Sequence, residues 1–225
     1  MEQREQPPIK RHAALMDRTY RFQRHIYDAT RKHYLLGRSL LIERLQPPHE
    51  GTALEVGAGT ASNLILAAEL YPTARLYGVD ISSMMLATAR TKIEHRGLSD
   101  RIRLQLADAT RLDGLSFFNV GQFDRIFFSY SLSMIPDWRA ALDCALTHLK
   151  PGGELHIVDF GDMSELPRIA KSGLRMWLRW FHVTPRDELR GAIASMALGD
   201  DHSCAFESLW SGYAFHAVIK KRASH

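Results

Sequence analysis

Acidic residues close three short apolar runs of this sequence, and a glycine turn lies beside the first of them. Glu55 precedes Gly57 and Gly59 in LEVGAG, Asp80 ends LYGVD, and Asp108 follows LQLA. Glycine lets a backbone turn tightly and approach a ligand closely, and a carboxylate accepts hydrogen bonds from hydroxyl, amine or ammonium groups. Each acid alone is explained equally well as a helix cap or turn residue. Together they indicate a binding site for a ligand that carries hydroxyl groups and positive charge.

The spacing of the apolar runs predicts the elements that would position these residues. Short apolar runs alternate with amphipathic helical stretches, which is typical of a parallel sheet. We expect strands at about Thr52–Val56, Arg75–Val79, Ile102–Leu106, Phe123–Phe128 and Glu154–Asp159. Ligands of such sheets bind beyond the carboxyl ends of the strands, so the three acids should line one site.

The remaining turn signals in the sequence predict the organisation of the chain. LKPGGE (149–154) is typical of a helix end and a Pro-Gly turn that feeds the fifth strand. Cys204–Trp210 and Tyr213–Lys221 alternate around Ser211-Gly212, which predicts a terminal hairpin. We divide the chain into an N-terminal helical cap segment, residues 1–48, and a domain over residues 49–225 that form one structural unit.

The composition fits one α/β domain. The 225 residues are 45% hydrophobic, enough for one full core, and the net charge of +4 is compatible with nucleic acid, an anionic membrane surface or an acidic metabolite as partner. Cys144 and Cys204 have no metal-ligand spacing, so neither a disulfide scaffold nor a metal site is indicated. The N-terminus lacks an apolar signal stretch, and no run of about 18 apolar residues occurs. We therefore expect a cytoplasmic protein that does not span a membrane.

A second pattern whose residue types could take part in binding or chemistry is YRFQRHIYDATRKHYLLGR, residues 20–38. On a helix, tyrosines and arginines would interleave along one face, opposite an apolar face. This tyrosine-arginine stripe consists of Tyr20, Arg24, Tyr27, Arg31, Tyr34 and Arg38. Aromatic rings attract cations, and guanidinium groups pair with carboxylate or phosphate. A solvated basic face with snorkelling tyrosines explains the same periodicity equally well.

The glycine turn, Asp80, Asp108 and LKPGG together resemble the class I S-adenosylmethionine-dependent methyltransferases, over about Thr52 to Phe160. The resemblance implies an α/β fold with a Rossmann-like seven-stranded sheet whose last strand is antiparallel, and S-adenosylmethionine as cofactor. It implies these contacts: Glu55, Gly57, Ala58 and Gly59 at the methionine end, Asp80 at the ribose, Ile81 beside the adenine, Asp108 and Ala109 at its edge, and Ser129 after the fourth strand. Ala61 replaces a third glycine, a mild departure.

Some alternatives for this sheet are less well supported by the sequence. A nicotinamide dehydrogenase would share Asp80 as a ribose ligand, but Glu55 and Ser62 do not suit a pyrophosphate. Ser82 or Ser83 is a better helix cap than Asp80. Base-flipping methyltransferases carry an Asn/Asp-Pro-Pro-aromatic motif where this chain reads FFSYSLSMIPDW, so no nucleic acid partner is expected.

The tyrosine-arginine stripe, together with Met16-Asp17 and FHVTPR, is similar to the bacterial diacylglycerylhomoserine N-methyltransferases of betaine-lipid synthesis. That resemblance implies three successive methyl transfers to the amine of a lipid substrate, diacylglycerylhomoserine. For this chemistry we predict Tyr27, Tyr34 and Tyr130 as catalytic groups and Arg31, Arg38 and His182 as substrate ligands, with Arg31 or Arg38 pairing the homoserine or the methionine carboxylate. Quinone-precursor C-methyltransferases share a looser pattern and remain an alternative, as does a non-catalytic module of the same fold.

A basic amphipathic stretch, Leu166 to Phe181, bears on where such a lipid would be met. Arg168, Lys171, Arg175 and Arg179 would share one helical face, opposite an apolar one. Such a helix can lie in an anionic membrane interface, or it can pack its apolar face on the domain. We expect peripheral contact with an anionic membrane surface, which follows more from the substrate than from this helix.

Overall fold

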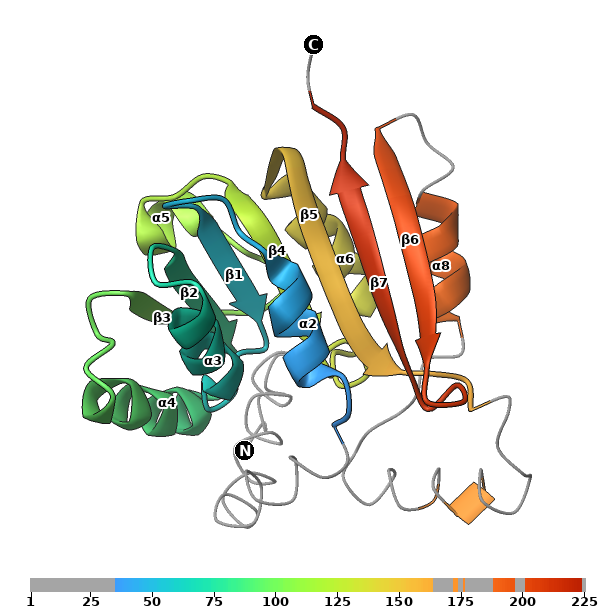
Figure 1. Ribbon diagram of the computed structural model, residues 1–225, viewed down its shortest axis with the longest axis horizontal. Coiled ribbons are helices and arrows are strands. Elements are labelled where there is room, and N and C mark those ends of the chain that lie inside the picture. The colour runs from blue at the N-terminus through green and yellow to red at the C-terminus, as the bar shows by residue number, and fades with distance from the viewer. Residues whose placement is uncertain (1–34, 164–171, 174–175, 177–187, 197–200, 224–225) are drawn as a thin grey trace, which may run out of the picture.

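The computed structural model describes residues 35–163, 172–173, 176, 188–196 and 201–223. A sheet of seven strands in the order β3-β2-β1-β4-β5-β7-β6 forms its centre (Figure 1). The strands are β1 (Thr52–Val56), β2 (Arg75–Asp80), β3 (Ile102–Leu106), β4 (Phe123–Ser129), β5 (Leu149–Phe160), β6 (His202–Leu209) and β7 (Ala214–Lys221). Strands β1 to β5 are parallel, whereas β7 is antiparallel to both β5 and β6. The predicted Rossmann-like sheet with its antiparallel last strand is confirmed.

Helices cover both faces of this sheet (Figure 1). One layer consists of α2 (Arg38–Leu45), α3 (Ser62–Leu70) and α4 (Ser83–His95), and the other of α5 (Gly114–Phe118), α6 (Trp138–Thr147) and α8 (Leu189–Met196). The two layers bury separate apolar clusters, and neighbouring strand residues alternate between them: Ala53 packs in the first and Leu54 in the second. Strand β1 is buried at all five positions, because a central parallel strand is covered on both faces.

Local signals placed several boundaries correctly. Strands β1 and β3 match their predicted ranges residue for residue. Ser82 is the N-cap of α4, and its side chain accepts a hydrogen bond from the Met85 amide at 3.2 Å. An N-cap oxygen satisfies one of the amides that a helix start leaves without a partner, which is why a serine here marks the end of the β2–α4 loop.

The prediction for residues 149–153 was wrong. Helix α6 does end at Thr147, but β5 already begins at Leu149, which pairs with Phe123 of β4. The next pair on these strands is Arg125 with Glu154, so the Pro-Gly segment forms an irregularity within the strand rather than a turn before it. Leu149 is fully buried, and burial of this side chain keeps the start of the strand on the sheet.

The predicted continuous helix through Arg38 was also wrong. Gly37 has a left-handed φ of 89°, and α2 begins only at Arg38. A Cβ at Gly37 would lie 3.0 Å from the Trp210 ring, so the chain turns here against the β6–β7 connection. Arg38 therefore does not continue a helix that passes through residues 35–37, and the other members of the tyrosine-arginine stripe lie outside the described residues. No helix within the described ranges is long and apolar enough to cross a membrane.

Candidate functional site

The glycine turn after β1 is clamped between two neighbouring strands. Gly57 has φ 82°, and the amides of Gly57 and Ala58 both donate to the Val79 carbonyl of β2 at 2.9 Å. A Cβ at Gly57 would lie 2.5 Å from the Ser131 Cβ, so only glycine allows the segment after β4 to pack here. Ser131 in turn donates its hydroxyl to the Val56 carbonyl at 2.7 Å. The turn is thus held in shape by both neighbours of β1.

Asp80 at the end of β2 holds the other side of the same turn. Its Oδ2 accepts the Gly59 amide at 2.7 Å, and its Oδ1 accepts the Ser82 amide at 2.8 Å. One carboxylate therefore joins the glycine turn to the start of α4, while its side chain stays partly exposed. Ala61, which replaces a third glycine, has φ 59° at the start of α3.

The residues after β3 lie beside Asp80, as predicted for a shared strand edge. Asp80 pairs with Leu106, and the Ala107 amide donates to the Asp80 carbonyl at 3.0 Å. Asp108 follows, and its Oδ1 accepts both the amide and the hydroxyl of Thr110 at 2.9 Å. Asp108 therefore stabilises the turn after β3 through its Oδ1 atom. Its side chain is only partly buried.

Two apolar positions assigned to the adenine also lie at this edge. Ile81 packs against Met85 beside Met134. Ala109 is partly buried and packs on the apolar cluster that contains Val79. The structure thus brings Asp80, Ile81, Asp108 and Ala109 together around the ends of β2 and β3, whereas their individual contacts to a cofactor remain predictions.

A buried polar chain lies on the other side of the glycine turn. Glu55 in β1 is 1% exposed, and its Oε1 accepts a hydrogen bond from Asn63 Nδ2 of α3 at 2.6 Å. Asn63 Oδ1 accepts from Arg38 Nε at 2.9 Å and from Arg38 Nη2 at 2.7 Å. Sequence reasoning found Glu55 and Arg38 but missed Asn63. The available signal was an amide side chain in the first turn of the helix SNLILAAEL, directly before five apolar residues.

The segment after β4 is buried rather than open. Ser129 is 6% exposed, and within the described residues its hydroxyl has no hydrogen-bond partner. Tyr130 has φ 56°, and its hydroxyl donates to the Leu36 carbonyl. Burial raises the pKa of Tyr130 well above its ordinary value, with further increases from Tyr213 and Asp159. Tyr130 is therefore a neutral hydrogen-bond donor that holds residues 35–37 against the end of the sheet.

Several predicted acceptor residues cannot be placed. Tyr27, Arg31, Tyr34 and His182 lie outside the described residues, so their assigned roles remain predictions.

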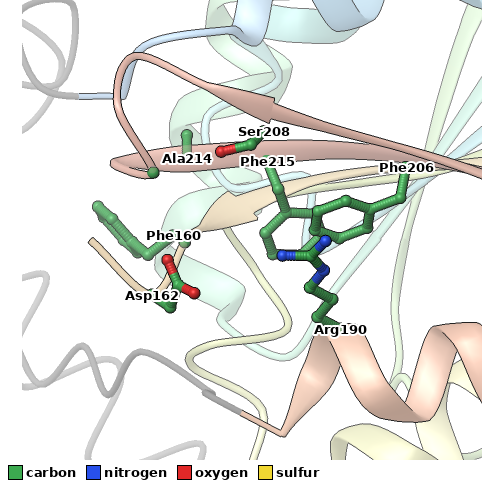
Figure 2. Close-up of a pocket in the computed structure, with 9 residues that line it drawn as sticks. Phe160, Asp162, Arg190, Phe206, Ser208, Ala214 and Phe215 are labelled. Carbon is green, nitrogen blue, oxygen red and sulfur yellow. The ribbon is translucent and has the colours of Figure 1, made fainter. Parts of the chain in front are cut away.

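A separate cleft lies at the far end of the same strand edge (Figure 2). It is lined by Phe160, Gly161, Asp162, Arg190, Phe206, Ser208, Gly212, Ala214 and Phe215. The Arg190 guanidinium lies 4.7 Å above the Phe206 ring, which stacks on Phe215 at 5.0 Å. Strand β6 is four strands from β1, which at about 4.8 Å per strand separates Phe206 from the glycine turn by roughly 19 Å. The β6 wall of the cleft is therefore far from that turn, whereas Phe160 at the end of β5 lies only two strands from β1.

Two buried histidines lie under α2 in this far half of the sheet. His156 of β5 and His216 of β7 stack at 5.6 Å and are 2% and 4% exposed. Arg44 of α2 approaches His216 Nδ1 at 3.2 Å and pairs with Glu207. Burial lowers the pKa of His216 to about 4, helped by the charges of His156 and Arg44. Burial also lowers the pKa of His156, although Glu154 Oε2 lies 3.4 Å from its Nε2. Both rings are neutral at pH 7.

Comparison with known proteins agrees with this geometry. Residues 53–153 match the family described as "Methyltransferase domain". The chain is 34% identical to demethylmenaquinone methyltransferase of Thermus thermophilus over 48% of this chain and 46% of that protein. It is 33% identical to phosphatidylethanolamine N-methyltransferase of Cereibacter sphaeroides over 48% of this chain and 50% of that protein. The chain thus spans about half the length of the curated relatives that it matches.

A solved structure shows the same fold over nearly the whole chain. The plantazolicin methyltransferase BpumL, in complex with a triazolic desmethylPZN analog and S-adenosylhomocysteine, matches with a TM-score of 0.66 and 12% identity, covering 95% of this chain and 98% of that chain. The fold is the class I methyltransferase fold, and residues 53–153 are similar to a methyltransferase domain. The side chains of this site fit S-adenosylmethionine. Asp80 and Asp108 lie where the hydroxyl and amine groups of the cofactor are expected, and Glu55 with Arg38 lies beside the glycine turn.

Proposed function

We propose that this protein is an S-adenosylmethionine-dependent N-methyltransferase that converts diacylglycerylhomoserine to its trimethylated betaine lipid by successive methyl transfers. The observation that carries the cofactor is the Asp80 carboxylate, which holds the glycine turn through Gly59 and stays partly exposed. The amine-lipid acceptor is supported by the similarity to a phosphatidylethanolamine N-methyltransferase and by the tyrosine-arginine stripe.

Methyl transfer requires the protein mainly to position the cofactor and the acceptor and to exclude water from the site. When bound, the cofactor supplies a methyl group on a positively charged sulfur. Asp80 and the clamped glycine turn fix where that group is presented, and the buried residues after β4 form a dry wall beside it. Tyr130 stays protonated, so its part in the proposal is to shape this wall and to donate a hydrogen bond. The acceptor nitrogen must lose a proton before each transfer.

The acceptor also determines where the protein works. A diacyl lipid remains in a bilayer, so the enzyme must meet it at the membrane surface. The net charge of +4 favours association with anionic lipid. We therefore propose a cytoplasmic enzyme that associates peripherally with the membrane and acts on a lipid substrate.

A second candidate is C-methylation of a quinone precursor, which the similarity to a demethylmenaquinone methyltransferase supports. The two acceptors differ in the atom that is methylated, a basic nitrogen in one and a ring carbon in the other. Purified enzyme would be incubated with S-adenosylmethionine labelled in its methyl group and with vesicles that contain either diacylglycerylhomoserine or demethylmenaquinol. We expect label in mono-, di- and trimethylated lipid. Label in the quinol alone would replace the proposal by the second candidate.

A further inference from the structure

Asn63 links two opposite charges that come from different elements. Its amide group donates to Glu55 of β1 at 2.6 Å and accepts twice from Arg38 of α2, at 2.9 Å and 2.7 Å. Asn63 itself is 7% exposed and lies in the first turn of α3, directly after the glycine turn. No role follows for it from the glycine and acid motifs, yet three elements meet at this one side chain.

The chemistry of the amide explains why asparagine suits this position. Burying a carboxylate such as Glu55 costs free energy unless donors satisfy it. An amide has a donor end and an acceptor end, so one side chain can donate to the acid and accept from the guanidinium. An aspartate here would keep the acceptor for Arg38 but would place a second carboxylate against Glu55.

The position of the Glu55–Asn63–Arg38 network along the strand edge indicates which part of a ligand this network faces. Asp80 and Asp108 lie at the ends of β2 and β3, on one side of β1, and suit the hydroxyl and amine groups of a nucleoside. Glu55 lies two residues before Gly57 on β1, and α2 contacts α3 and β4 on the other side. A ligand with its nucleoside at β2 and β3 therefore extends its other end toward Glu55 and Arg38. In S-adenosylmethionine that end carries one ammonium and one carboxylate.

We propose that Asn63 is a positioning residue that holds Glu55 and Arg38 as a matched receptor for the amino-acid end of the cofactor. Glu55 receives the ammonium, and Arg38, whose Nε and Nη2 groups are oriented by Asn63, receives the carboxylate through its guanidinium charge. The inference rests on the proposed cofactor but not on the identity of the methyl acceptor.

The test compares two ligands that differ only at this end. S-adenosylhomocysteine carries the amino-acid group, whereas 5′-methylthioadenosine keeps the nucleoside and the thioether sulfur without it. Dissociation constants for both would be measured by calorimetry with wild type, Asn63→Asp and Arg38→Gln. Asn119→Asp is the matched control, because it makes the same chemical change at an exposed position after α5.

We expect Asn63→Asp to weaken S-adenosylhomocysteine at least ten-fold while methylthioadenosine changes less than two-fold. Arg38→Gln should show the same selectivity, and the double variant should lose less than the product of the single losses, because neighbouring residues of one network are not additive. Asn119→Asp should leave both affinities unchanged.

Each other outcome is informative. Equal loss of both ligands in Asn63→Asp would assign Asn63 to the fold alone, and unchanged affinities would remove it from the site; either result overturns the inference. If Asn63→Asp does not fold, a non-selective result with Arg38→Gln has the same consequence. Wild type that binds neither ligand overturns the inference and the proposed cofactor together. Wild type that binds both ligands but methylates no lipid overturns only the proposed acceptor.

Discussion

The two halves of the strand edge are built differently. At the ends of β1 and β2, each acid is fixed by a near neighbour: Asp80 by the Gly59 and Ser82 amides, and Glu55 by Asn63. At the ends of β5 to β7, the cleft is lined by aromatic rings and by Arg190, which stacks on Phe206. The first half is a polar network held by backbone amides and by the Asn63 side chain, whereas the second combines aromatic rings with Asp162, Arg190 and Ser208 from segments far apart in the sequence. The difference explains why motifs identify the cofactor half and say little about the β5–β7 half.

Asp80→Ala is expected to have the largest effect, because it removes a ligand for the ribose and the acceptor for the Gly59 amide at once. Hydrogen bonds to charged groups contribute about 1.5 to 3 kcal/mol each, so the affinity for S-adenosylmethionine should fall at least ten-fold by calorimetry. The matched control is Asp113→Ala, which removes an acid that caps α5 through the Ser116 amide. Unchanged affinity in a folded Asp80→Ala variant would remove β2 from the cofactor site.

How far the sequence predicts this structure depends on the separation of the interacting residues. The bounds of β1 and the Ser82 cap follow from local patterns, since the relevant partners lie within a few positions. The Arg38–Asn63 hydrogen bond joins residues 25 positions apart, and the Tyr130–Leu36 hydrogen bond joins residues 94 positions apart. Nothing in the spacing of these residues predicts either contact. Only the folded sheet brings these segments together.

The two corrections have the same cause. The break at Gly37 is explained by its contact with Trp210, far along the chain. The early start of β5 is explained by the pairing of Leu149 with Phe123. In both places tertiary contacts decide what the local residues, a glycine within a helical pattern and a Pro-Gly pair, leave open.

Acid should loosen the β5–β7 half before the cofactor half. His216 has a folded pKa of about 4 against about 6.5 in an unfolded chain, so the unfolded state binds more protons between these values. The associated stability is complete above about pH 6.5 and is lost as the pH falls toward 4, which amounts to about 1 to 2 kcal/mol at pH 5. Urea unfolding at pH 7.5 and pH 5.0 measures the loss.

The charged groups around the histidine pair make a variant comparison possible. Arg44 and Glu207 face His216, and Glu154 faces His156 with Arg125 and Lys220 beside it. His216→Gln should reduce the difference between the two pH values, whereas His49→Gln, at an exposed position, should not. Hydrogen-exchange protection factors, which correct for the intrinsic pH dependence of exchange, should fall at pH 5 more in β7 than in β1. Uniform loosening of both halves would contradict the assignment to the histidine pair.

Tyr130→Phe should separate a structural from a catalytic tyrosine. The variant removes the hydroxyl that donates to the Leu36 carbonyl but keeps the ring that packs on Phe160 at 4.7 Å. Loss of one such hydrogen bond costs about 1 kcal/mol, measured by urea unfolding, and the affinity for S-adenosylmethionine should not change. Tyr77→Phe, which removes a hydroxyl from another buried tyrosine that packs against Phe118, is the control and should change stability less than Tyr130→Phe. A large fall in kcat with wild-type stability would instead indicate that Tyr130 takes part in catalysis.

The smallest expected effect concerns Arg190 and the membrane, and it depends on a comparison of two stacked arginines. Arg139 lies 4.2 Å above Trp138 and pairs with Glu188 at 2.8 Å, whereas within the described residues no carboxylate pairs with Arg190. A basic residue near an anionic bilayer contributes at most about 1 kcal/mol, so Arg190→Gln should weaken binding to phosphatidylglycerol-containing vesicles by about two- to five-fold in sedimentation. The loss should disappear with neutral phosphatidylcholine vesicles and shrink as salt is raised. Arg139→Gln removes the same charge from a paired position and should have less effect. If both variants lose binding equally, net charge alone explains the attraction and the cleft at β5–β7 has no special part in it.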